Sequence, residues 1–165
     1  MRKLLVLWMA LALLLIAIPA AGAKPNARPF KGSMNGSVTF EVDPNCHNNP
    51  WSMRTDSQAT GVVSHMGRAR MTGSHCTPGA TEIQGGEMTL TAANGDRVFI
   101  EYEGTALPPN EDGIVVADVE FTIVGGDGRF DGATGGGDMS GFIVFEGFGD
   151  PEWAASWVWQ GAIGY

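Results

Sequence analysis

Residues 121–137 read FTIVGGDGRFDGATGGG, and this stretch decides how the rest of the chain is interpreted. Apolar and polar residues alternate up to Val124, after which glycines dominate. Glycine supplies positive φ angles and close backbone approach, so we expect the strand to break here and the chain to turn. Phe130 is the one large apolar residue in the turn, which predicts an anchor that plugs a barrel end or packs beneath a sheet, with Arg129 directed to water. A flexible linker is the alternative, but alternating sequence on both sides disfavours it.

Alternation with period two recurs along the rest of the chain and predicts antiparallel strands, each with one packed and one solvated face. The expected strands are 33–42, 58–66, 69–76, 87–92, 97–105, 115–124, 138–145 and 153–163. No segment after the N-terminal region shows a helical period. Eight short strands, several of which contain glycine, predict one all-β domain formed by a closed eight-stranded antiparallel barrel, because closure removes exposed sheet edges. A two-sheet β-sandwich is the alternative.

The glycine-rich turn also carries a family resemblance. GGDGRFDGATG at 125–135 resembles the Gly-Gly-x-Gly-x-Phe-x-x-Ala-x-Gly signature of the allene oxide cyclase and dirigent barrels, and is closer still to small secreted bacterial proteins of that type. A weaker match, SHMGR at 64–68, is similar to a Thr-His-Leu-Gly-Arg hairpin of those bacterial proteins. The resemblance implies an allene oxide cyclase-like barrel from about Phe30 to the end. The signature holds no catalytic residue and therefore implies no reaction.

The N-terminal region has the composition of an export signal. It begins MRK, continues as an apolar run and reaches the small-residue sequence AGA at 21–23. The apolar run is shorter than the ~20 residues that a membrane-spanning helix needs, and no stop-transfer charges follow it. We therefore expect a signal peptide at 1–23, a barrel domain at 24–165, no stable membrane insertion after cleavage, and a periplasmic or secreted protein.

The charge and the absence of sequence motifs narrow the choice of partners. The chain has a net charge of −8, which becomes −10 if Arg2 and Lys3 leave with the signal. An acidic surface repels phosphate backbones, so we do not expect nucleic acid as a partner. The sequence lacks a phosphate-binding loop, a nucleophile elbow and a zinc-protease motif, and we expect no cofactor. Glu101 and Glu103 share one strand face, where we expect them to be solvated.

The chain has two cysteines, Cys46 and Cys76. In an oxidising compartment an even number of cysteines favours a disulfide, which would stabilise the fold by ~3–4 kcal/mol. His47 and His75 adjoin them, so a structural zinc site is the alternative. Adjacent residues on a strand point to opposite faces, which hinders such a site. We expect the disulfide and no metal.

The last strand places Trp153, Trp157 and Trp159 on one face. Either these indoles fill the barrel interior, or they form an aromatic wall for a ligand, since ligand pockets are mostly apolar. The candidate ligand-binding residues are those expected to point inward: Phe40, Tyr102, Phe121, Trp157 and Trp159.

Candidate catalytic residues are few and weakly indicated. If His65 lies at the end of an apolar inner face, it is a candidate acid or base, because its unperturbed pKa is close to physiological pH. Tyr102 is a second candidate. The alternative for His65 is a single hydrogen bond to a backbone carbonyl and no chemical role.

Three functional hypotheses follow. We prefer an exported, non-enzymatic barrel that binds a small apolar ligand. The resemblance implies a second hypothesis, a cofactor-free cyclase or isomerase that folds its substrate in a shaped cavity. The third is an envelope or extracellular interaction module, which could form a homo-oligomer through Phe142 and Val144 on the outer face of their strand.

Overall fold

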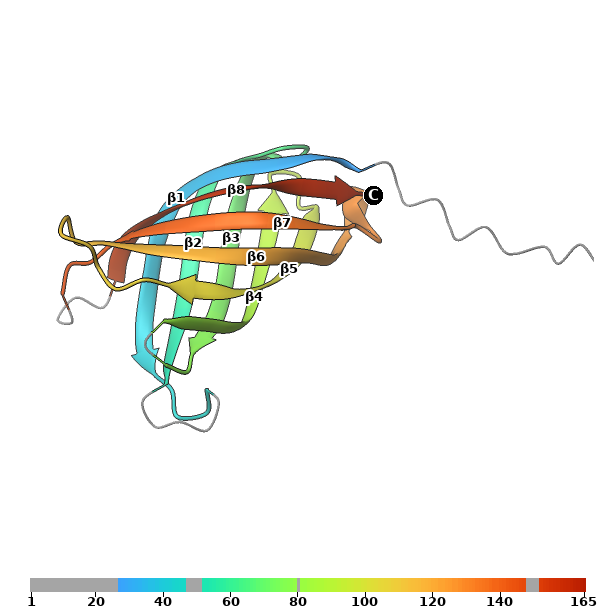
Figure 1. Ribbon diagram of the computed structural model, residues 1–165. Helices are drawn as coiled ribbons and strands as arrows, with labels where there is room; N and C mark the ends of the chain where they lie inside the picture. The colour runs from blue at the N-terminus through green and yellow to red at the C-terminus, as the bar shows by residue number, and fades with distance from the viewer. Residues whose placement is uncertain (1–26, 47–51, 80, 148–151) are drawn as a thin grey trace, which may run out of the picture.

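The computed structural model describes residues 27–46, 52–79, 81–147 and 152–165, so the expected signal peptide at 1–23 lies outside it. Eight strands form one closed antiparallel barrel in chain order, which confirms the predicted fold and excludes the sandwich (Figure 1). The strands are β1 Arg28–Val42, β2 Met53–Val63, β3 Gly67–Thr77, β4 Glu82–Ala92, β5 Arg97–Ala106, β6 Ile114–Asp127, β7 Thr134–Val144 and β8 Glu152–Gly164. Within the described part of the chain, no helix is long and apolar enough to cross a membrane.

The barrel closes where the first strand pairs with the last. β1 and β8 run antiparallel from the Arg28–Ile163 pair to the Thr39–Glu152 pair. Among the described strands, all other pairs join neighbours in the sequence, so this seam is the one strand pair between segments far apart in the chain. Arg28 and the C-terminal residue Tyr165 consequently lie at the same end of the barrel, where the Arg28 guanidinium donates to the Tyr165 hydroxyl at 3.2 Å (Figure 1).

The glycine-rich stretch is more regular than the sequence predicts. β6 continues through Gly125 and Gly126, and β7 already includes Gly135–Gly137, so the expected break after Val124 is wrong. The reason is close approach of neighbouring strands. A Cβ atom on Gly137 would lie 2.2 Å from the Gln160 carbonyl oxygen. Most of these glycines therefore allow the strands to coil tightly, and the turn itself is short.

The turn between β6 and β7 contains a short 3-10 helix, η1 Gly128–Phe130, and closes one end of the barrel. Phe130 is fully buried and packs edge-on against Tyr165 with ring centroids 4.9 Å apart, so its predicted role as an anchor is confirmed. The Arg129 guanidinium lies 4.9 Å from the Phe130 ring, pairs with Asp96 at 3.4 Å and donates to the His65 carbonyl. It remains partly exposed. We call this the plugged end.

The plugged end is filled by apolar side chains from all sides of the barrel. Its fully buried members are Phe30, Met34, Val63, Met71, Leu90, Val98, Ile123, Phe130 and Ile163. On the outside, Glu101 and Glu103 are exposed, as the alternation predicts. Phe142 and Val144 on the outer face of β7 are 40% and 41% exposed.

Candidate functional site

The opposite end of the barrel, which we call the cavity end, holds a cavity of about 220 Å³. It lies among the ends of the odd-numbered strands and the starts of the even-numbered strands, beneath the Leu107–Pro109 segment. Its aromatic lining residues are Phe40, His75, Tyr102, Phe145, Trp153 and Trp157. Aliphatic side chains from β1, β4, β6 and β7 complete the wall, so the cavity is mainly apolar.

Two indoles from β8 form much of the aromatic wall. The Trp153 ring lies 4.4 Å from the Phe40 ring and 4.9 Å from the Phe145 ring, centroid to centroid. Its Nε1–H donates to the Gly147 carbonyl at 3.3 Å. Trp157 lies next to Gly141, where a Cβ atom would come within 3.2 Å of the indole. The wall is therefore fixed by ring packing and by small neighbours.

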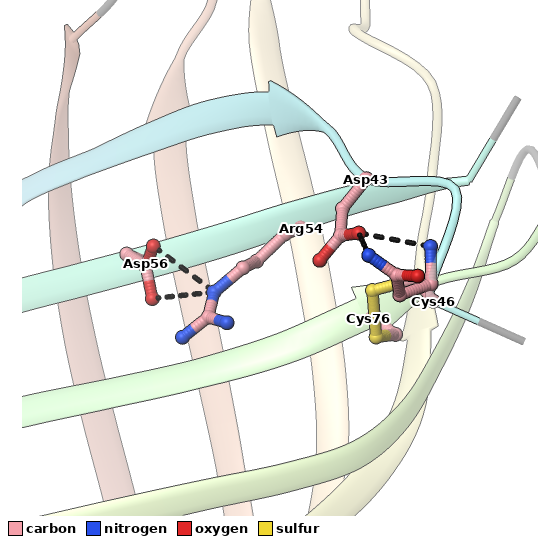
Figure 2. The surroundings of a disulfide bond; sticks show 6 residues. Asp43, Cys46, Arg54, Asp56 and Cys76 are labelled. Carbon is pink, nitrogen blue, oxygen red and sulfur yellow. Dashed lines mark hydrogen bonds and ion pairs between the residues drawn. A yellow bond between two sulfur atoms is a disulfide. The ribbon is translucent and has the colours of Figure 1, made fainter.

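A disulfide joins Cys46 to Cys76 with Cα atoms 5.6 Å apart, which confirms the predicted bond (Figure 2). It ties the segment that follows β1 to the end of β3, next to the cavity. Nearby, the Asp43 carboxylate accepts hydrogen bonds from the backbone and side-chain amides of Asn45 at 2.9 and 3.1 Å. Both thiols are consumed by the disulfide, so neither is a metal ligand; His47 lies outside the described residues.

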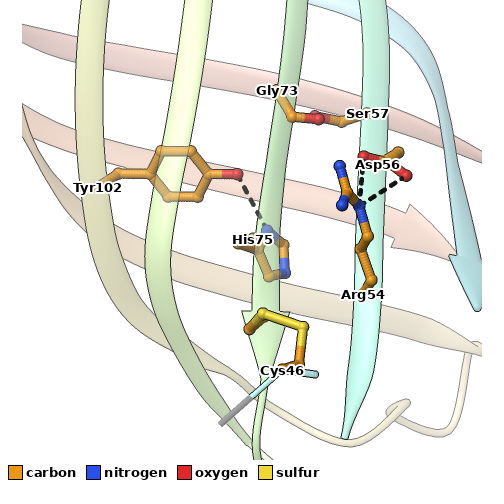
Figure 3. Close-up of polar contacts among 8 residues, drawn as sticks. Cys46, Arg54, Asp56, Ser57, Gly73, His75 and Tyr102 are labelled. Atoms are coloured by element: carbon orange, nitrogen blue, oxygen red, sulfur yellow. Dashed lines mark hydrogen bonds and ion pairs between the residues drawn. A yellow bond between two sulfur atoms is a disulfide. The ribbon is translucent and has the colours of Figure 1, made fainter. Parts of the chain in front are cut away.

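The main polar feature of the cavity is a pair formed by His75 on β3 and Tyr102 on β5. The His75 Nδ1 and the Tyr102 hydroxyl oxygen are 3.0 Å apart, with the two rings edge to face (Figure 3). β4 lies between these two strands, and its Gly86 pairs with Tyr102. A Cβ atom at Gly86 would lie 2.6 Å from the Tyr102 ring. Because Gly86 has no side chain, the Tyr102 phenol can reach across β4 to the His75 imidazole.

Burial keeps both members of the pair uncharged. Loss of hydration lowers the pKa of His75 to about 4, although the Asp56 carboxylate acts in the opposite direction. Burial raises the pKa of the Tyr102 phenol, with a smaller contribution from Asp56. At neutral pH the imidazole and the phenol are therefore both neutral, and their contact is a hydrogen bond rather than an ion pair.

The remaining polar groups of the cavity come mainly from β2. Thr55 pairs in register with His75 and is almost fully buried, and the Ser57 hydroxyl donates to the Gly73 carbonyl at 3.2 Å. Among the described lining residues, none is Asp, Glu, Lys or Arg. The site therefore has hydrogen-bonding capacity without formal charge.

The structure divides the predicted ligand-binding residues into two groups. Phe40, Tyr102 and Trp157 line the cavity. Phe121 and Trp159 lie in the filled core instead: Phe121 packs against Phe30 at 6.2 Å, and a Cβ atom on Gly32 would lie 2.3 Å from the Trp159 indole. Ligand contact by any of these side chains stays a prediction.

His65 does not face the barrel interior. It lies in the turn between β2 and β3 with φ of 64°, at the plugged end, and its Nε2 is 3.0 Å from the Pro29 carbonyl oxygen. The structure thus agrees with the alternative, in which His65 makes one hydrogen bond to a backbone carbonyl. The expected continuation of the strand to Met66 is wrong because the chain turns after Val63.

Sequence reasoning missed His75 as a cavity residue and considered it only as a ligand beside Cys76. The alternation along β3 could have predicted it: Ala69 and Met71 point inward, and His75 lies an even number of residues from both, so it falls on the same face of the strand. Its proximity to Tyr102 could not be read from the sequence. That contact depends on the position of β4 between the two strands and on Gly86.

Comparisons with known proteins find a structural similarity but no match to a family model or a curated sequence. Among solved structures, it is similar to the pterocarpan synthase dirigent protein GePTS1, with a TM-score of 0.48 and 14% sequence identity over 84% of this chain and 86% of that chain. Similarity at this level says nothing of activity. The closed eight-stranded antiparallel barrel is the architecture that the resemblance to dirigent and allene oxide cyclase-like barrels implies, so the resemblance is confirmed as a likeness of fold.

Proposed function

We propose that the chain is an exported barrel that binds a small apolar molecule in the cavity end. The observation that carries the proposal is the contrast in packing: a barrel that is filled at one end keeps a cavity of about 220 Å³ at the other, walled by Phe40, Trp153 and Trp157. Apolar surface that stays unburied in a folded protein favours a ligand that covers it.

The cavity volume limits the size of the ligand. Ligand pockets usually measure ~300–1,000 Å³, so this cavity of about 220 Å³ lies below that range. A single substituted ring is of the right size for a cavity of this volume, whereas a long lipid chain would extend beyond it.

Export is supported by two independent observations. The sequence of residues 1–23 has the basic, apolar and small-residue regions of a signal peptide. The Cys46–Cys76 disulfide belongs to oxidising compartments. N-terminal sequencing of protein recovered from the periplasm or medium should begin at Lys24. Recovery of the uncleaved chain in the cytosol with free thiols would contradict export.

The binding proposal is tested with cumene, an apolar single-ring probe. Titration into isotope-labelled protein should shift the NMR resonances of Trp157 and Tyr102, which line the cavity, and leave Trp159 and Phe121 nearly unchanged. Trp157→Ala should alter the cumene dissociation constant, whereas Phe142→Ala on the outer face should not. No shift up to the solubility limit, together with native mass spectra of host-purified protein that show no bound molecule, would reject the proposal.

A cofactor-free isomerase or cyclase is a second candidate, favoured by one observation. His75 and Tyr102 place two groups that can exchange protons inside an apolar cavity, where neither is charged at neutral pH. The wild-type protein should then catalyse exchange of the acetophenone methyl hydrogens for deuterium in D₂O, and His75→Phe should not. An exchange rate equal to that of buffer removes this candidate.

The outer face of the barrel supports a third candidate, association with a second copy. Phe142 and Val144 on β7 and Val158 on β8 are between 40% and 45% exposed. Sedimentation velocity over a range of concentrations tests it directly. A dimer that dissociates in Phe142→Ser supports association through this face, and a monomer at every concentration rejects it.

A further inference from the structure

We propose that His75 is the polar anchor of the cavity: its Nε2–H donates a hydrogen bond to an uncharged oxygen, such as a ketone carbonyl, on an otherwise apolar ligand. The inference rests on the proposed binding function and adds to it the chemical class of the ligand and the residue that recognises it.

The hydrogen-bond pattern of the pair determines which ring nitrogen carries the proton. The Tyr102 hydroxyl is buried, and its partner is the His75 Nδ1 at 3.0 Å. If Nδ1 were the donor, the phenolic hydrogen would need an acceptor in an apolar surrounding, and leaving it without one is costly. Donation from Tyr102 to Nδ1 avoids that cost. The neutral imidazole then carries its hydrogen on Nε2.

The Nε2–H group is available to a ligand. Among the residues that the structure describes, none accepts a hydrogen bond from it. The His75 ring lines the cavity beside the hydroxyl-bearing Thr55, its partner across the β2–β3 pair. His75 is half-buried and lines the cavity, so a ligand oxygen that enters the cavity can accept a hydrogen bond from Nε2–H. The same tautomer leaves Nε2 without a lone pair, so this donor role and the role of a base in the isomerase candidate exclude each other.

The surroundings exclude a charged partner for this group. The described lining residues include no ionised side chain, and burial keeps His75 neutral down to about its pKa of 4. A carboxylate or an ammonium group would enter without a counter-charge, and burial of an unpaired ion is strongly unfavourable. A neutral oxygen loses less hydration and recovers a hydrogen bond, so the cavity selects uncharged, oxygen-bearing molecules.

Three probes of similar size and shape test the inference: acetophenone, which has a carbonyl; cumene, which has none; and benzoate, which is charged. The deciding quantity is the ratio of the acetophenone to the cumene association constant, compared between wild type and His75→Phe by calorimetry. The ketone loses more hydration than the hydrocarbon in either protein, so only the change in this ratio reports the hydrogen bond. We expect His75→Phe to lower the ratio by about three- to tenfold, as for one net hydrogen bond, and benzoate not to bind.

Two variants and one spectrum complete the design. Tyr102→Phe removes the group that fixes the tautomer and should lower the same ratio by less than His75→Phe does. His65→Asn alters the imidazole in the turn at the plugged end and should leave the ratio unchanged. In the wild type, ¹⁵N shifts should show His75 protonated on Nε2, and acetophenone, but not cumene, should move the Nε2–H resonance; this result does not require a folded variant.

The outcomes separate this inference from the binding proposal. If cumene and acetophenone both bind and His75→Phe leaves their ratio unchanged, the anchor is rejected while the apolar cavity stands. Protonation of His75 on Nδ1, or binding of benzoate as tight as that of acetophenone, also rejects the anchor. If neither neutral probe binds the wild type, both proposals fail.

Discussion

The two ends of this barrel are built from the same eight strands, yet one is filled and the other keeps a cavity. At the plugged end, Phe130 and Phe30 are fully buried, and the glycines of β7 let its neighbours approach closely. At the cavity end, equally apolar side chains stand apart around about 220 Å³. Alternation of apolar residues therefore determines which side chains point inward. Turns and close contacts between strands determine whether those side chains meet.

The largest expected effect tests the plugged end. Phe130→Ala should lower the free energy of unfolding by about 3–5 kcal/mol, because it removes a fully buried ring and leaves a void. Urea denaturation measures the loss, with Phe142→Ala on the outer face as the control, for which we expect less than ~1 kcal/mol. The affinity for cumene should stay the same in the folded variant. A large change in that affinity would show that the two ends are coupled.

The disulfide is the matching test at the cavity end. Replacement of Cys46 and Cys76 by serine should cost ~3–4 kcal/mol, since the bond closes a loop with a sequence separation of 30 and restricts the unfolded chain. Urea denaturation of the double variant, compared with oxidised wild type, gives the value. We also expect weaker cumene binding here, in contrast to Phe130→Ala. Unchanged binding would show that the cavity keeps its shape without the covalent tie.

The pH dependence of stability reports the buried imidazole. The pKa of His75 is about 4 in the folded protein against 6.5 for an unperturbed histidine, so the unfolded state binds the proton first as the pH falls. As far as His75 determines it, the free energy of unfolding should be at its maximum above pH ~6.5 and should fall by roughly 3 kcal/mol between that pH and about 4. His75→Phe should remove this part of the decline, while His65→Asn should keep it. Parallel curves for wild type and His75→Phe would contradict a buried neutral imidazole.

The smallest expected effect compares one substitution at the two ends. Ala59→Leu inserts bulk where the core is packed and should destabilise by about 1–3 kcal/mol. Ala117→Leu lies at the cavity wall, where space exists, so we expect a change below ~1 kcal/mol together with a clear loss of cumene affinity. Equal destabilisation by the two substitutions would mean that the cavity end is as tightly packed as the plugged end.

The sequence predicts the fold well because a barrel strand carries its own signal. Period-two alternation identifies the inward faces of β1, β5, β6 and β8, and Phe130 stands out as the single large apolar residue in its turn. Strand ends are less predictable. β2 starts at Met53, before the predicted start at residue 58, and the sequence does not reveal this because the inward-facing Thr55 and Ser57 are polar and interrupt the apolar pattern.

The site is only partly predictable, since it depends on side chains from different strands. Alternation along the strands predicts that Phe40, Tyr102 and Trp157 point inward, but it does not predict which end of the barrel holds the cavity. Phe121 and Trp159 also point inward, yet they lie in the filled core. The sequence gives no reason to place His75 beside Tyr102. That contact follows from the register of three strands and from the absence of a side chain at one glycine on the middle strand.

The seam between β1 and β8 has a consequence for how the molecule is made. During synthesis β1 emerges long before β8, so one edge of the growing sheet stays without its partner strand until nearly the whole chain has been made. Pairings between distant segments form slowly because the intervening chain must first be ordered. We therefore expect closure of the barrel to be a late and slow step, before which the sheet has two open edges that can pair with other chains.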